Sequence, residues 1–324
     1  MRSLRLSSAA LLTTLTIALA ATEVQAQAKF PDKPVTIIVH ASAGGGSDIF
    51  ARTMAATAEK ERLFPQPLVV ENKPGGSGGI AFAYVAGKKK SPYYMVTAVT
   101  AFMTTPLMGL TPVGLKDFTP IANFAFDEYV LMVNANSRFK TLKDAIDYAR
   151  ANPKGVTVGG VILGSADSIC AYLIEKAAGV QLNYVVFNGG GEVNAALLGG
   201  HIDMSVGNPG ESLELVKAGK VRVLGVFSEK RLAGAPDIPT LKEQGVNAVY
   251  VQNRGLVAPA GIPDNARESL VNLCLAYSKT AEFKKYCADN MLTESYMDSA
   301  TFGEFLADWT ERYKVILKDM KLIK

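Results

Sequence analysis

The chain has 324 residues, of which 48% are hydrophobic and 20% charged, and its formal net charge at pH 7 is +4. This composition is typical of a globular protein with a sizeable core and excludes a disordered chain. The weak positive charge argues against the strongly basic surface with which proteins bind nucleic acids.

Residues 1–26 predict a secretory signal peptide. Arg2 and Arg5 precede an apolar run over residues 9–20, and small residues follow up to Ala26, where we expect cleavage. Threonines interrupt the apolar run, whereas a membrane anchor needs about 20 apolar residues. We therefore expect an exported, soluble mature protein that is not embedded in a membrane.

The first element of the mature chain is an apolar run over residues 35–39, which predicts a strand. A glycine-rich turn joins it to a helical pattern and comprises Ser42, Ala43, Gly44, Gly45, Gly46, Ser47 and Asp48. Glycines in such a turn let a ligand approach bare backbone N–H groups, and the helix adds the positive end of its dipole. The pattern therefore predicts one half of an anion-binding site.

Strands and helices alternate over the next hundred residues. Strands are predicted at residues 67–70, 93–99, 121–126, 129–133 and 156–161, and helices reach residues 86 and 151. Residues 100–105 are expected to form a loop. Thr141 and Asp144 have the spacing of a capping box and predict the start of the helix that reaches residue 151.

A second glycine-rich turn follows a predicted strand at residues 185–187. It comprises Asn188, Gly189, Gly190, Gly191 and Glu192 and leads into another helical pattern. Two such turns, about half the chain apart, suggest two half-sites that face one anion.

Further strands are predicted at residues 202–206 and 221–227, and extended segments at 249–251 and 255–257. From residue 263 to the end we expect helices, the last with a capping box formed by Thr301 and Glu304. The alternation implies parallel βαβ units. Because no flexible linker divides the chain, we expect one lobe of residues 29–126 plus 250–324 and a second of residues 127–249.

Groups for catalysis or metal binding are sparse. His40 and His201 have no neighbouring carboxylate or cysteine cluster, and no nucleophile elbow, phosphate-binding loop or dinucleotide motif occurs. We therefore predict no enzyme, no metal and no cofactor. Cys274 and Cys287, 13 residues apart on two predicted helices, are either a disulfide or two buried free thiols.

Several motifs in a fixed order resemble those of one known family. They include AGGGSD at residues 43–48, VENKPG at 70–75, PDIPT at 236–240 and LVAPAG at 256–261. The chain is similar over residues 30–324 to the extracytoplasmic solute receptors of tripartite tricarboxylate transporters, the Bug family. The resemblance implies a two-lobed α/β periplasmic-binding-protein fold of the Venus-flytrap, type II-like kind, with a ligand cleft between the lobes.

The resemblance also implies a function. Such receptors are periplasmic, bind a small organic carboxylate and deliver it to the membrane permease subunits of a tripartite transporter. We expect a monomer. Its ligand is expected to be an aromatic or a dicarboxylic acid, and the aromatic alternative rests on Phe102 and Phe187, which could stack on such a ligand. A receptor that docks on a sensor kinase is the alternative, and an exported enzyme is a third hypothesis.

Carried onto this sequence, the family's ligand site combines the two glycine-rich turns with three further segments. The first lobe adds Thr100, Ala101 and Thr104. The second lobe adds Gly164, Ser165, Asn208 and Pro209. Asp48 is expected to cap its helix or to bind water rather than to contact an anion.

Overall fold

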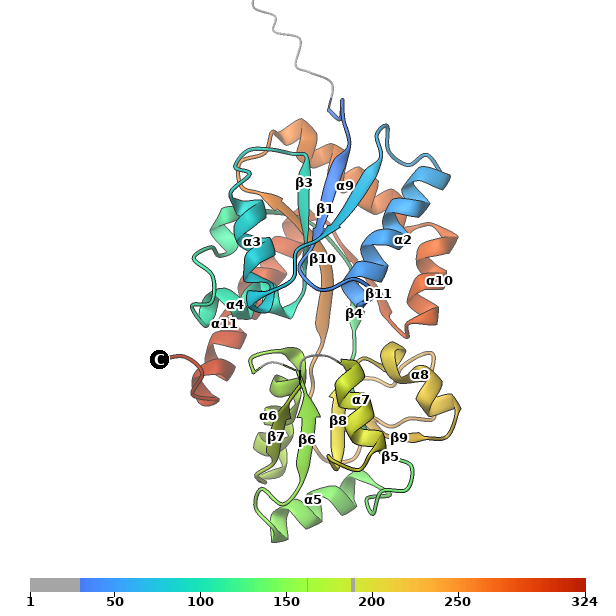
Figure 1. Ribbon diagram of the computed structural model, residues 1–324. Helices are drawn as coiled ribbons and strands as arrows, with labels where there is room; N and C mark the ends of the chain where they lie inside the picture. The colour runs from blue at the N-terminus through green and yellow to red at the C-terminus, as the bar shows by residue number, and fades with distance from the viewer. Residues whose placement is uncertain (1–29, 162, 188–189) are drawn as a thin grey trace, which may run out of the picture.

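The chain forms two lobes, each built around its own β-sheet, which lie one beyond the other in Figure 1. The computed structural model describes residues 30–161, 163–187 and 190–324. The predicted signal peptide therefore lies outside the described residues. None of the helices in the described ranges is long and apolar enough to cross a membrane.

The first lobe contains a mixed six-stranded sheet in the order β11-β4-β10-β3-β1-β2. The strands are β1 (Val35–Val39), β2 (Leu68–Asn72), β3 (Tyr94–Ala98), β4 (Phe118–Asp127), β10 (Gln252–Pro259) and β11 (Thr293–Met297). β1 is parallel to β2 and β3, whereas β10 is antiparallel to β3 and β4, and β11 is antiparallel to β4. The expectation of parallel units therefore holds for only part of this sheet.

Helices cover both faces of the first sheet, because alternate residues of its strands point to opposite sides. Val35, Ile37 and Val39 pack in a core with the helices of one face, and Ile38 packs in the core of the other face. The first group of helices is α2 (Gly46–Lys60), α9 (Asp264–Ser278) and α10 (Ala281–Asp289). The second group is α3 (Gly79–Ala86), α4 (Thr100–Leu107) and α11 (Ser299–Asp319).

The second lobe contains a mixed five-stranded sheet in the order β7-β6-β8-β5-β9. Its strands are β5 (Val130–Asn134), β6 (Thr157–Gly160), β7 (Asn183–Val186), β8 (Met204–Gly207) and β9 (Val221–Val226). The helices around it are α5 (Leu142–Ala151), α6 (Ala166–Ala178), α7 (Gly190–Leu198) and α8 (Pro209–Lys217). Short 3-10 turns at Gly76–Gly78 and Leu115–Asp117 complete the elements.

The chain passes twice between the lobes. β4 of the first sheet ends at Asp127 and β5 of the second begins at Val130. The return passage lies between β9, which ends at Val226, and β10, which begins at Gln252. A third link joins the lobes away from these passages, where Tyr172 of α6 donates a hydrogen bond of 2.7 Å to Asp319 of α11. Figure 1 shows the end of α11 reaching toward the second lobe.

The structure corrects three local predictions. Residues 100–107 form α4 rather than a loop, because Phe102 and Met103 are buried in the core and hold the segment helical despite Pro106. The segment after α10 contains the strand β11 rather than continuous helix. The last helix is capped by Asp298, which accepts from the Thr301 N–H at 2.9 Å, so the capping box with Glu304 is wrong.

The predicted start of α5 is confirmed. The Thr141 hydroxyl accepts from the Asp144 N–H at 3.2 Å, and the Asp144 carboxylate accepts from the Thr141 N–H at 2.9 Å. This reciprocal pair satisfies two backbone donors at the helix N-terminus.

The disulfide alternative for Cys274 and Cys287 is not formed, since both are free thiols in the structure. They are buried beside Tyr277 and Phe283 in the core formed by α9 and α10. Burial raises the pKa of Cys287 to about 12 and that of Cys274 further, so both thiols stay protonated.

Candidate ligand cleft

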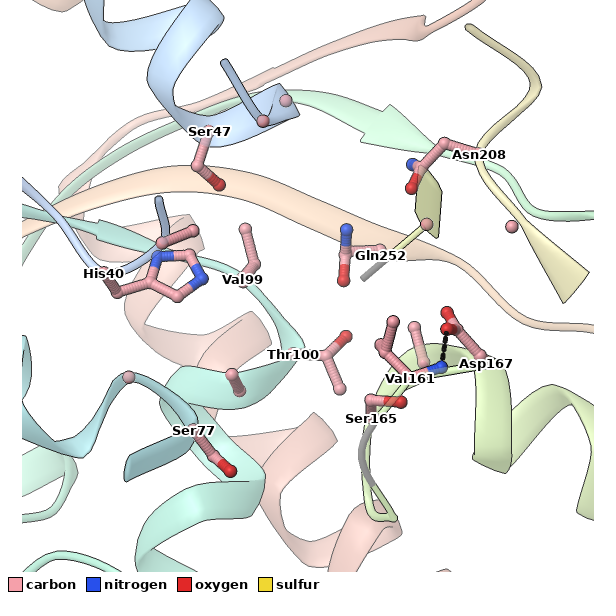
Figure 2. Close-up of a pocket in the computed structure, with 18 of the residues that line it drawn as sticks. His40, Ser47, Ser77, Val99, Thr100, Val161, Ser165, Asp167, Asn208 and Gln252 are labelled. Carbon is pink, nitrogen blue, oxygen red and sulfur yellow. Dashed lines mark hydrogen bonds between the residues drawn. The ribbon is translucent and has the colours of Figure 1, made fainter. Parts of the chain in front are cut away.

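A cavity of about 540 Å³ is lined by residues of both lobes. Its walls come from segments that follow strands: the β1–α2 turn, the loop before α3 and the start of α4 in the first lobe, and the starts of α6, α7 and α8 in the second. In Figure 2, Ser47 and Ser165 approach the same space from opposite lobes, and Gln252 of β10 lies between them. The ends of strands from two sheets therefore converge on one cleft.

Most of the predicted site residues in the described part of the chain line this cavity. They are Ser42, Ala43, Gly45, Gly46, Ser47, Thr100, Ala101, Thr104, Gly164, Ser165, Gly190 and Asn208. Five others, Gly44, Asp48, Gly191, Glu192 and Pro209, are not among the lining residues. Asn188 and Gly189 lie outside the described residues.

The first-lobe turn is held by the carboxylate of Asp48, which is only 2% exposed. It accepts hydrogen bonds from the Gly44 N–H at 2.9 Å, from Asn72 at 2.9 Å and from Arg52 at 3.0 Å. Burial alone would raise its pKa, but the bonds from Arg52, Gly44 and Asn72 hold the pKa of Asp48 below its usual value. Asp48 is therefore an ionised structural group whose charge is balanced by Arg52. The N-terminus of α2 still lines the cavity.

The hydroxyls at the start of α4 are engaged within the protein. Thr100 is hydrogen-bonded to Tyr250 and lies 3.3 Å from the Tyr313 hydroxyl. Thr104 donates to the backbone oxygen of Thr100 at 3.3 Å. These residues shape the wall of the cleft, but their hydroxyls already have partners.

The aromatic side chains expected to stack on a ligand are not in the cavity wall. Phe102 is 2% exposed and packs against Phe82 and Phe118, with ring centroids 5.4 and 4.9 Å apart. Phe187 is also absent from the lining, in which Tyr129 and His40 supply the rings. The expectation that Phe102 stacks on an aromatic acid is wrong, because the ring serves the core of the first lobe.

A buried ion pair beside the cleft was not predicted from the sequence. Arg254 of β10 is 6% exposed, lines the cavity and is paired with Asp127 at the end of β4. Burial alone would lower the pKa of Arg254, but Asp127 raises it, so the guanidinium stays charged. Its Nε and Nη1 atoms have no hydrogen-bond partner in the structure.

Two further carboxylates in the wall were not predicted. Asp167 in the first turn of α6 is 6% exposed and accepts from the Val161 N–H at 2.7 Å, the bond drawn in Figure 2. Burial and the nearby Glu211 raise the pKa of Asp167 to about 7, against the effect of that bond. Glu211 in the first turn of α8 is accessible to solvent. Partial desolvation and the negative charge of Asp127 raise the pKa of Glu211, whereas the positive charge of Arg254 lowers it.

His40 is a neutral member of the wall. Its Nδ1 lies 2.8 Å from the Thr97 hydroxyl, and its ring stacks on Phe82 with centroids 5.8 Å apart. Burial and the positive charge of Arg254 lower the pKa of His40 to about 4. His40 therefore supplies shape and a hydrogen-bonding ring rather than charge.

Within the described ranges, no group of three or more His, Cys, Asp or Glu side chains could hold a metal ion. The lining combines backbone amides at helix N-termini, hydroxyls and a few charged groups. Such a wall can bind a small polar ligand through hydrogen bonds and charge.

Two lobes that enclose a ligand cleft define the class of two-lobed periplasmic solute-binding proteins, and the comparisons with known proteins specify the family. The family model for the tripartite tricarboxylate transporter family receptor matches residues 49–322, and the chain belongs to this family. A UPF0065 protein in the gbd 5' region of Cupriavidus necator is 33% identical over 96% of this chain and 95% of its own.

Solved structures agree with this assignment. A TctC solute binding protein from Polaromonas, solved without ligand, is 30% identical, covers 90% of this chain and 99% of its own, and has a TM-score of 0.74. R. palustris Rpa4515, solved with adipate, is 24% identical, covers 89% of this chain and 97% of its own, and has a TM-score of 0.82. The predicted family and fold class are thereby confirmed.

Proposed function

We propose that this protein captures a small organic carboxylate in the cleft and delivers it to the permease subunits of a tripartite tricarboxylate transporter. The observation that carries the proposal is one cavity that helix N-termini of both lobes line together. Backbone N–H groups and the positive ends of helices favour anions there. The adipate in the related solved structure from R. palustris is in keeping with this chemistry.

In the same proposal, ligand binding favours a closed arrangement of the lobes because the ligand contacts both. Residues 29–126 with 250–324 move as one lobe and residues 127–249 as the other, about the two passages of the chain. The protein acts as an exported monomer in the periplasm after cleavage near Ala26, and it catalyses no reaction.

A thermal-shift screen tests the proposal. Mature protein is unfolded and refolded to remove bound ligand and is then titrated with citrate, malate, adipate, glutamate, nicotinate and benzoate. A ligand that binds only the native state stabilises it by about 2.7 kcal/mol at 100 times its Kd. We expect a dose-dependent rise of the melting temperature with one or more of these acids. No shift with any of them contradicts the proposal.

A glycine variant locates the binding site. A Cβ atom at Gly46 would lie 3.1 Å from Nη2 of Arg254, so valine there displaces the guanidinium or fills the end of the cleft. We expect Gly46→Val to abolish the shift. Gly114→Val is the matched control, because Gly114 lies outside the cavity lining and has open space where its Cβ would be. Equal affinities in the two variants would place the ligand elsewhere.

A further inference from the structure

The charged residues of the cavity wall are separated by lobe. Three charged side chains are among the lining residues: Arg254, Asp167 and Glu211. Arg254 extends from β10 of the first sheet, whereas Asp167 and Glu211 belong to the first turns of α6 and α8 in the second lobe. The first-lobe side of the cavity therefore carries a guanidinium that is paired with Asp127, and the second-lobe side, with two carboxylates, is its anionic end.

The Arg254 side of the cavity has hydrogen-bond donors available for one carboxylate. A Cβ atom on Gly46 would lie 3.1 and 3.2 Å from Nη2 and Nη1 of Arg254, so the guanidinium lies against the first residue of α2. Asp127 binds Nη2, but Nε and Nη1 are buried without a partner. A buried donor without a partner is costly, and a ligand carboxylate would satisfy it together with the N-terminal amides of α2.

The anionic end holds two carboxylates and a buried hydroxyl. Asp167 has a hydrogen bond from the Val161 N–H, which leaves further acceptor capacity on its carboxylate. Glu211 lies beside the start of α7, since a Cβ atom on Gly190 would be 2.7 Å from its Oε2. The Ser205 hydroxyl is fully buried, lines the same cavity and has no hydrogen-bond partner.

We propose that the ligand is an amino-carboxylate, with its carboxylate at Arg254 and the α2 N-terminus and its protonated amine at Asp167 and Glu211. This inference rests on the proposed function and narrows its substrate class. An ammonium group donates three hydrogen bonds, and its positive charge offsets the negative charge of the two carboxylates. A second ligand carboxylate at that end would face like charges instead, which is a means of rejecting diacids.

Matched pairs of ligands test the inference on the wild-type protein. Isothermal titration of refolded protein compares ω-amino acids from glycine to 6-aminohexanoate with diacids of the same chain length, such as 5-aminopentanoate with adipate. Scanning the length varies the spacing between the carboxylate and the amine of the ligand. We expect at least one amino acid to bind ten-fold or more tightly than its matched diacid. Equal or tighter binding of the diacid at every length overturns the inference.

A paired variant tests the assigned residues. Asp167→Asn with Glu211→Gln preserves shape, and the asparagine oxygen can still accept from the Val161 N–H. We expect ten-fold or greater loss of affinity for the preferred amino acid and a gain for the matched diacid. Asp308→Asn, an exposed carboxylate of α11 paired with Arg312, is the control and should change neither affinity. Unchanged preference in the paired variant contradicts the assignment.

The two proposals fail in different ways. A folded protein that binds diacids or monocarboxylates without preferring an amine contradicts the inference but keeps the receptor function. A folded protein that binds none of these acids contradicts both. Melting curves of wild type and variants, recorded beforehand, show that each is folded.

Discussion

Asp48 of α2 and Asp167 of α6 occupy the first turns of helices that follow glycine-containing turns, yet their surroundings differ. Both are buried, at 2% and 6% exposure. Asp48 is bonded by Gly44, Asn72 and Arg52, and its pKa is lowered, whereas Asp167 is bonded by Val161, faces the cleft and has a pKa raised to about 7. The carboxylate of Asp48 in the first lobe is thus bound by side chains of its own lobe. The carboxylate of Asp167 in the second lobe lines the cavity, where a ligand can reach it.

The largest expected effect comes from breaking the buried Arg254–Asp127 pair of the first lobe. Arg254→Gln leaves Asp127 buried without its counter-charge, and loss of one partner of such a pair costs about 3–5 kcal/mol. We expect a matching fall in the free energy of unfolding in urea and loss of carboxylate binding.

The double variant Arg254→Gln with Asp127→Asn is the control for that effect. Because it removes both charges, we expect it to recover much of the stability but none of the binding. A double variant that is as unstable as the sum of both single variants would show that the charges do not act as a pair.

The next prediction sets the two aspartates against each other at pH 8. Asp48→Asn places an amide where Gly44, Asn72 and Arg52 all donate, so we expect a loss of about 1–3 kcal/mol. Asp167→Asn removes a desolvated charge and keeps an acceptor for Val161, so we expect a gain of about 4 kcal/mol in the ligand-free protein. Chemical unfolding of both variants measures the signs, and changes of the same sign contradict the comparison.

The gain from Asp167→Asn should depend on pH. The folded-state pKa of Asp167, about 7, lies above the usual value of 3.8 for an aspartate, so the native state binds the extra proton between these values. The stability from this group is therefore fully present below about pH 4 and lost as the pH rises through about 7. We expect wild type and variant to be nearly equal in stability at pH 4 and to diverge up to pH 8. A constant difference across this range would exclude titration as the cause.

Sequence patterns were sufficient for features that local chemistry determines. The capping box of Thr141 and Asp144 placed the start of α5, and the glycine-rich turn at Gly44–Gly46 fixed where β1 gives way to α2. These signals lie within a few residues of what they predict. The motif order identified the family and therefore the two-lobed fold.

The charged part of the cleft could not be found in this way. Asp127 and Arg254 are 127 residues apart, at the end of β4 and near the start of β10, so only the sheet shows them to be partners. Asp48 and Asp167 look alike in sequence, and their difference arises from Arg52 and Asn72 beside the first. β11 is an edge strand with half-exposed residues, and its sequence has no marked alternation.

The smallest expected effect compares the N-terminus of α5, which has a structural cap, with the N-terminus of α6, which lines the cavity. The Thr141 hydroxyl caps α5, so Thr141→Ala should cost about 1 kcal/mol of stability and leave binding unchanged. Ser165 is the N-cap residue of α6, but its side chain makes no capping bond and lines the cavity. Ser165→Ala should therefore cost less than 0.5 kcal/mol, a rough bound for sites without a lost contact, while weakening ligand binding. Unfolding and titration of both variants give the two readouts, and a Ser165→Ala variant that loses stability but binds normally would make Ser165 a structural cap like Thr141.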